Sequence, residues 1–174
     1  MIYFVIILSL ILFLWLPVNS AIAYGVSVDR LANCLCYMYM HASWLHLAIN
    51  TLSLFLLWPP VRRLYIMRYN THTHFLSGAT YLSAILAGAF CATATPTVGM
   101  SGMVFFLLGA LLALNPIKQQ LINYVWVFLA VLVQVFFGHS NVPLHLFAFA
   151  EGALYICIRE FLYQYKTHTG VFQC

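Results

Sequence analysis

Charge is scarce in this sequence. Only 6% of its 174 residues are Asp, Glu, Lys or Arg, whereas soluble domains carry about 25%. Hydrophobic residues make up 64% of the chain, which excludes a water-soluble globule and predicts an integral membrane protein. At about 20 apolar residues per membrane-spanning helix, the chain has room for about six spans. We therefore expect residues 1–174 to form a single all-α transmembrane domain, with no separate soluble domain.

Acidic residues are rarer still, with three in the whole sequence. Because no carboxylate accompanies them, the seven histidines match no familiar zinc motif, and His-Glu-x-x-His is absent. The five cysteines are scattered and odd in number, so they predict no disulfide framework. We expect neither a metal nor another cofactor. The net charge of +4 is interpreted as a topology signal, not as a sign of nucleic-acid binding.

Six apolar segments follow one another along the chain, separated by polar or proline-containing stretches. We expect them to form membrane-spanning helices over residues 2–16, 44–58, 75–91, 101–114, 121–137 and 143–163, the second with a start as early as Cys36. Pro59-Pro60 is predicted to end the second helix, and Asn115-Pro116 the fourth. The fourth segment is short, so we expect it to begin below the membrane surface.

The first segment has an alternative interpretation as a cleaved signal peptide. Ala21-Ile22-Ala23 resembles a cleavage site, but no Lys or Arg precedes the apolar run, and a signal peptide needs a basic start. We therefore retain residues 2–16 as the first helix.

Basic residues indicate the orientation of the six helices. If the N-terminus is cytoplasmic, six of the seven basic residues fall in cytoplasmic loops or ends, namely Arg62, Arg63, Arg68, Lys118, Arg159 and Lys166. Arg30 is the exception. Cytoplasmic loops of membrane proteins are enriched in Lys and Arg, so the sequence predicts that both termini are cytoplasmic.

The tetrapeptide Gly99-Met100-Ser101-Gly102 places a serine at the start of the fourth apolar segment. Free backbone N–H groups at a helix N-terminus can stabilise an oxyanion. His145, at the start of the sixth segment, is a candidate base for this serine. No acidic residue lies three or four positions from His145, and Glu151 lies on another helix face. The sequence therefore permits a Ser–His dyad rather than a triad, and we interpret Glu151 as an interhelical hydrogen-bond partner or a residue near the inner leaflet.

The second segment contributes further polar residues. His46 and Asn50 are four positions apart, so they share one face of a helix. Polar side chains inside a membrane are costly and tend to mark functional interiors. We expect both to donate hydrogen bonds to an oxyanion beside Ser101. The alternative is that they only bridge neighbouring helices.

Together these motifs resemble those of the rhomboid family of intramembrane serine proteases. The matching residues are Gly99, Ser101, Gly102, Phe105 and Gly109 in the fourth segment, His145, Ala148 and Gly152 in the sixth, and His41, His46 and Asn50 in the second. The resemblance implies a six-helix bundle in which Ser101 attacks the scissile carbonyl and His145 accepts its proton.

The resemblance also implies supporting roles. Oxyanion stabilisation and support would come from His46, Asn50, His41, Gly99 and Gly102. Phe105 would pack against the ring of His145, and the small residues Ala148 and Gly152 would let the fourth and sixth helices approach closely. The implied partners are the lipid bilayer and single-span or C-terminally anchored membrane proteins, the substrates to be cut.

Several positions depart from the family pattern. Ala148 stands where a glycine is usual, the Trp-Arg pair of the first outer loop is missing, and Trp58-Pro59-Pro60-Val61-Arg62 replaces the usual Gly and Glu after the second helix. These departures, with Ser43-Trp44 before His46, resemble the rhombosortase branch, which is associated with processing C-terminal anchors on exported bacterial proteins. The location this implies is the bacterial inner membrane.

Two other functions fit parts of the sequence. A catalytically silent rhomboid-like protein would bind transmembrane helices without cutting them. A small transporter would use Glu151 and the histidines, but the inverted repeats and broken helices of transporters are not evident. Residues 138–142 are expected either to cover a water-filled cavity above Ser101, lined by His139, Ser140 and Asn141, or to form a plain loop.

Overall fold

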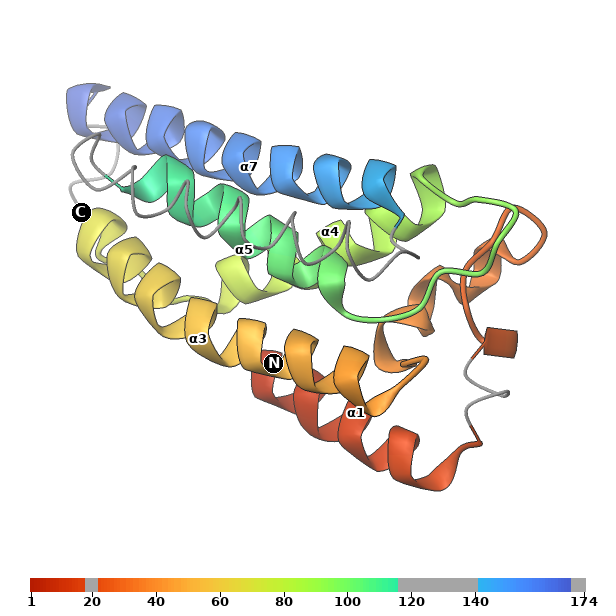
Figure 1. Cartoon of the computed structure of the whole chain (residues 1–174). Helices are drawn as coiled ribbons and strands as arrows, with labels where there is room; N and C mark the ends of the chain where they lie inside the picture. The colour runs from red at the N-terminus through yellow and green to blue at the C-terminus, as the bar shows by residue number, and fades with distance from the viewer. Residues whose placement is uncertain (18–21, 116–140, 170–174) are drawn as a thin grey trace.

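Five long helices account for most of the structure, a computed structural model that describes residues 1–17, 22–115 and 141–169 (Figure 1). They are α1 (Ile2–Trp15), α3 (Trp44–Tyr69), α4 (His74–Phe90), α5 (Ser101–Leu114) and α7 (Val142–Thr169). Two short 3₁₀ helices, η1 (Leu31–Leu35) and η2 (Tyr37–Tyr39), precede α3. A β-bridge between Val26 and Thr97 joins the loop after α1 to the loop before α5.

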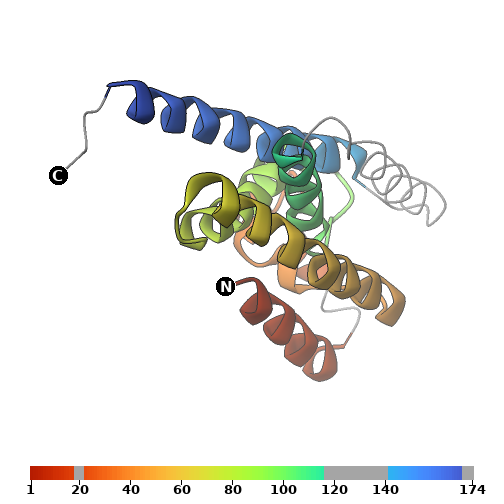
Figure 2. The same cartoon turned by 90° about the vertical axis from the view of Figure 1, so that its left-hand side faces the viewer.

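Helix α5 lies at the centre of the bundle. Every residue from Ser101 to Leu111 is buried, as expected for a helix that is apolar all round. Helices α3, α4 and α7 pack around it, and α1 lies against α3 on the side away from α5 (Figures 1 and 2). Because α5 begins with Ser101, this packing places the start of the α5 helix among its neighbours.

Helices α5 and α7 approach each other more closely than ordinary side chains allow. A Cβ atom on Gly109 would collide with the carbonyl oxygen of Phe149, and a Cβ on Gly152 would collide with that of Phe106. Ala148, on the same helix as Gly152, is fully buried. Small residues at such crossings let helix backbones meet inside a membrane, as predicted for positions 148 and 152.

The expected helix boundaries hold for the central elements. Helix α5 has the predicted bounds at both ends, and α4 begins and ends one residue before the expected positions. Helices α3 and α7 are long and apolar enough to cross a membrane, whereas α1, α4 and α5 are shorter apolar helices. The predicted fifth helix, residues 121–137, lies outside the described residues, as does Lys118.

The prediction that Pro59-Pro60 ends the second helix is wrong. Helix α3 continues through both prolines to Tyr69. The prolines remove two backbone donors, but three side chains beyond them, Val61, Tyr65 and Tyr69, are buried. Burial of this apolar and aromatic stripe favours continuation of the helix. Helix α7 likewise runs six residues past the expected Tyr163.

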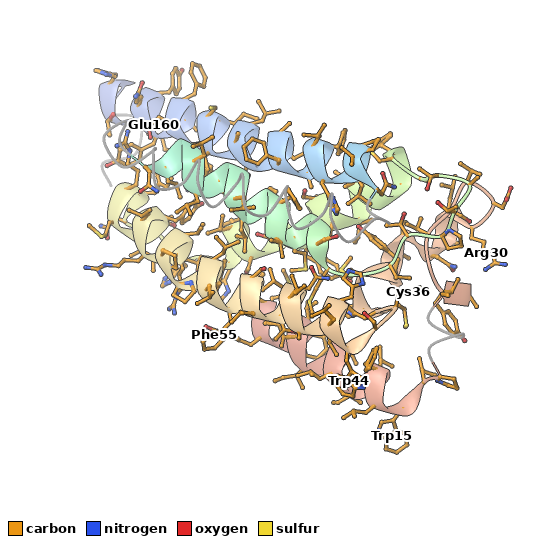
Figure 3. All side chains as sticks on the ribbon, viewed as in Figure 1. Trp15, Arg30, Cys36, Trp44, Phe55 and Glu160 are labelled. Atoms are coloured by element: carbon orange, nitrogen blue, oxygen red, sulfur yellow. The ribbon has the colours of Figure 1, made fainter. Side chains whose placement is uncertain are left out.

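The charged residues of the two longest helices lie mostly in their second halves: Arg62, Arg63 and Arg68 in α3, and Arg159, Glu160 and Lys166 in α7. Arg68, next to the end of α3, binds Glu160 in the second half of α7 through two hydrogen bonds of 2.9 and 3.0 Å. Arg30 lies at the opposite end of the molecule from Glu160 (Figure 3). We call the end with Arg68 and Arg159 the basic end of the bundle; Arg30 lies at the other end.

Candidate active site

Ser101 and His145 meet at the start of their two helices. The hydroxyl oxygen of Ser101, the first residue of α5, lies 2.8 Å from Nε2 of His145 in the first turn of α7. Only 4% of Ser101 and 5% of His145 are exposed. The pair is thus a hydrogen-bonded serine and histidine within the bundle, held by the close packing of α5 and α7.

Phe105 holds the histidine ring from one side. It lies one helical turn after Ser101, so both side chains share a face of α5. The rings of Phe105 and His145 are stacked, with centroids 4.4 Å apart and planes 15° from parallel. This contact, which the resemblance implied, limits rotation of the imidazole away from Ser101.

No carboxylate orients His145 among the residues that the structure describes. Glu151 instead accepts a hydrogen bond of 2.6 Å from the hydroxyl of Ser83 in α4. This confirms the interpretation of Glu151 as an interhelical hydrogen-bond partner. Among the described residues, the ring of His145 is therefore held by packing against Phe105 and not by an acid.

Gly99 brings the α3 side chains next to the serine. Its backbone has a φ of 107°, a conformation that favours glycine. A Cβ at this position would lie 2.8 Å from Nε2 of His46 and 3.1 Å from Nδ2 of Asn50. Both side chains therefore pack directly against the backbone two residues before Ser101.

Asn50 is a buried donor with no partner in the described chain. It is 3% exposed, and its Nδ2 makes no hydrogen bond to any residue between 1 and 17, 22 and 115, or 141 and 169. Leaving a buried amide unsatisfied costs about 1–3 kcal/mol. Such a group beside Gly99 is suited to receive an acceptor that arrives with a ligand.

The start of α3 fixes the direction of these side chains. Ser43 is the N-cap, and its hydroxyl accepts a hydrogen bond of 3.1 Å from the backbone N–H of His46. Trp44 packs edge-on against Phe13 of α1, with ring centroids 4.5 Å apart. Helix α3 is therefore anchored at the turn that carries His46.

His41 lies behind His46 rather than beside the serine. The two rings are 5.1 Å apart in an edge-to-face arrangement. His41 is 1% exposed. The backbone of Tyr39 interacts with the ring, but neither ring nitrogen makes a hydrogen bond of good geometry within the described residues. Its position supports that of His46.

Tyr37 is a structural residue of the site that the sequence did not reveal. Its carbonyl accepts a hydrogen bond of 3.0 Å from the N–H of Gly99, and its hydroxyl donates one of 2.6 Å to the carbonyl of Ala84. A Cβ on Gly88 would lie 2.6 Å from the ring. A Cβ on Gly102 would lie 3.3 Å from the hydroxyl. A glycine at position 88 is compatible with close packing on α4, but nothing in the sequence identifies the ring of Tyr37 as the group that packs there.

Asn141 caps the start of α7. Its Oδ1 accepts a hydrogen bond of 3.1 Å from the N–H of Leu144, and its Nδ2 donates to the carbonyl of Cys91 at 2.7 Å and to the hydroxyl of Thr97 at 3.2 Å. Asn141 thus ties the start of α7, and with it His145, to the loop that leads into α5. His139 and Ser140 lie outside the described residues.

Comparison with protein families matches a model of the rhomboid domain to residues 28–159, well over half of the chain. The chain belongs to the rhomboid family. The matched range contains the whole site, from His41 to Gly152. Proteins of this family are integral membrane proteins, so this chain is one too, and it is an intramembrane protease or a relative of one. No curated protein and no solved structure gave a match.

Possible metal ligands are dispersed in the part of the chain that the structure describes. No three His, Cys, Asp or Glu side chains gather there in a way that could hold an ion. The side chains that meet at the site supply a hydroxyl, an imidazole and an amide.

Proposed function

We propose that this rhomboid-family protein is a serine intramembrane endopeptidase that uses a Ser101–His145 dyad. The observation that carries the proposal is the 2.8 Å contact between the two side chains in a buried site. A serine hydroxyl is a weak nucleophile until an adjacent base accepts its proton. A buried serine that is hydrogen-bonded to a histidine meets this requirement.

The proposed reaction begins when Ser101 attacks the carbonyl carbon of a peptide bond. Neutral His145 takes the hydroxyl proton at Nε2, and the carbonyl oxygen becomes an oxyanion. His145 then gives the proton to the leaving amine. The C–N bond breaks and an acyl-enzyme remains on Ser101. Water then attacks the acyl carbon and gives a proton to His145, which passes it to the serine oxygen as the ester bond breaks and the carboxylic acid leaves.

Three donors are proposed to stabilise the oxyanion. Nδ2 of Asn50 is buried and unpaired, His46 lies against Gly99, and the backbone N–H of Ser101 precedes the first hydrogen bonds of α5. Such donors are effective because they are already oriented and shielded from water before charge develops. Gly99 and Gly102 support this arrangement by admitting His46, Asn50 and Tyr37 close to the chain.

We also propose six membrane spans with both termini in the cytoplasm, which places the enzyme as a multi-pass protein of the bacterial inner membrane. The basic end of the bundle, which holds Arg68 and Arg159, would face the cytoplasm. Ser101, at the opposite end of α5 from Asn115, would then lie towards the outer face. Cleavage would occur near the outer end of a substrate helix.

The proposed substrates are single-span or C-terminally anchored membrane proteins. The departures that resemble the rhombosortase branch, including Pro59-Pro60 after the second apolar segment, favour the C-terminally anchored class. Binding would take place within the lipid bilayer, with no metal or nucleic acid involved.

The test is cleavage in liposomes that contain the purified protein and one model substrate. Parallel samples would carry a single-span protein or a C-terminally anchored one. We expect Ser101→Ala to abolish cleavage and Ser77→Ala to leave it unchanged, because the buried Ser77 hydroxyl bonds the carbonyl of His74 in its own helix. Substrate that co-purifies with the wild-type protein but stays intact would support the silent binder instead.

A further inference from the structure

A second candidate site lies on the other side of α3 from the dyad. A groove of about 490 Å³ runs between the start of α1 and the second half of α3. Its lining includes Tyr3, Trp58, Pro59, Arg62, Arg63 and Met67. Because the rhomboid-domain match begins at residue 28, α1, and therefore one wall of the groove, lies outside the matched domain.

The groove carries two positive charges that the described chain does not neutralise. Arg62 and Arg63 are exposed, and no acidic side chain of residues 1–17, 22–115 or 141–169 forms an ion pair with either. Exposed arginines at a membrane surface are attracted to anionic headgroups.

The three acidic residues of the sequence are all accounted for elsewhere. Glu160 binds Arg68 through two hydrogen bonds. Glu151 accepts a hydrogen bond from Ser83 in the interior of the bundle. Asp29 is adjacent in sequence to Arg30, at the far end of the molecule (Figure 3). None of the three therefore supplies a counter-charge to the groove, which leaves its two arginines available to an anionic ligand.

The spacing of the lining residues aligns the charges with an apolar surface. Trp58 and Arg62 are four residues apart, and so are Arg63 and Met67. Residues four apart lie one above the other on a helix, so each arginine has an apolar neighbour along the same face of α3. Two adjacent guanidinium groups offer the planar donor geometry that suits a phosphate.

The apolar part continues towards the middle of α3. Phe55 lies seven residues before Arg62, about 10 Å along the helix, and it packs edge-on against Tyr3 of α1 at 6.5 Å. Phe55 is 57% exposed and lies at the α1 side of α3 (Figure 3). A ligand that fills the groove thus meets positive charge at one end and aromatic surface at the other.

We propose that this groove binds the headgroup of an anionic phospholipid. Arg62 and Arg63 bind the phosphate, while an acyl chain follows the exposed surface of Tyr3 and Phe55. The lipid contacts α1 and α3 together and so strengthens the attachment of α1 to the bundle. A free phosphate would use the arginines alone and leave the aromatic surface bare.

The experiment measures binding of phosphatidylglycerol and phosphatidylcholine to purified protein by native mass spectrometry. All samples carry Ser101→Ala, so the result does not depend on the proposed peptidase activity. We expect Arg62→Gln with Arg63→Gln to weaken phosphatidylglycerol binding about 30-fold, since each basic residue contributes about a 5-fold factor at an anionic surface. Arg62→Lys with Arg63→Lys keeps the charge but loses the planar donor geometry, so it should bind phosphatidylglycerol more weakly than the parent and more tightly than the glutamine pair.

A matched control removes the same net charge elsewhere, through Arg30→Gln with Lys166→Gln, and should bind phosphatidylglycerol as the parent does. Thermal unfolding of each variant in detergent checks that it is folded, and the lysine pair tests the site if the glutamine pair does not fold. Equal binding of both lipids by the parent would overturn the proposal. Parent-like binding by the glutamine pair, or glycerol phosphate binding as tightly as the lipid, would also overturn it.

Discussion

Substitution of Gly152 by alanine is a direct test of the link between helix packing and the dyad. An added Cβ would collide with the carbonyl oxygen of Phe106, whereas carbon and oxygen atoms in contact normally stay about 3.3 Å apart. We therefore expect α5 and α7 to separate by a distance on the order of 1 Å. Ser101 and His145 bridge the same two helices at 2.8 Å.

The expected result follows from that geometry. A displacement of about 1 Å takes the pair beyond hydrogen-bond range and lowers reactivity by roughly 100-fold. Overpacking also destabilises the bundle by about 1–3 kcal/mol. The assay is the rate of labelling by a fluorophosphonate, which reports serine activation, together with thermal unfolding in detergent.

Gly78 provides the matched control. It lies in α4, and a Cβ there would meet nothing within 4 Å. Gly78→Ala should keep the wild-type labelling rate and gain about 0.5–1 kcal/mol from higher helix propensity. Gly109→Ala should resemble Gly152→Ala, because its Cβ collides with the carbonyl of Phe149. Wild-type labelling by Gly152→Ala would refute the claim that close packing sets the dyad.

Three other substitutions or reactions test separate parts of the site. Asn50→Ala should lower kcat on a reconstituted substrate by about 10²–10³-fold with a smaller change in KM, as for other lost oxyanion donors. Tyr37→Phe should lower the free energy of unfolding by about 1 kcal/mol, measured by thermal unfolding in detergent, because the bond to the Ala84 carbonyl is lost. Burial and the neighbouring Cys34 raise the pKa of the Cys36 thiol, so less of it is thiolate at neutral pH. Its maleimide labelling, followed by peptide mass spectrometry, should be slow near pH 7 and accelerate as the pH rises.

Each of these has a contradicting result. A wild-type kcat for Asn50→Ala would leave that side chain a structural role only. An unchanged unfolding temperature for Tyr37→Phe would mean that its hydroxyl does not secure α4. Labelling of Cys36 at neutral pH as fast as that of an unfolded control would show that the thiol is not shielded.

The centre of the bundle was predictable because its signals are local. The glycine before Ser101 and the Asn-Pro pair after Leu114 mark both ends of α5, and the bounds agree. Residue type and position also identified Ser101 and His145 as a pair, and the family resemblance added Phe105; the structure brings the three together.

Other features depend on contacts that no sequence spacing encodes. The continuation of α3 beyond Pro59-Pro60 follows from burial of tyrosines further along the helix. The rule that proline ends a helix therefore failed there. The connections made by Tyr37 and Asn141 join segments about fifty residues apart, and either residue alone is compatible with a plain loop. Pairing of Ser83 with Glu151 likewise required knowing which helices are neighbours.

The most direct test of the central claim is fluorophosphonate labelling of the purified protein beside Ser101→Ala and His145→Ala, with Ser77→Ala as a folded control. The account predicts labelling of wild type and Ser77→Ala, and none of the two dyad variants, because the hydroxyl reacts only when a base activates it. Folded wild-type protein that takes no label, or His145→Ala protein that labels normally, would contradict the dyad.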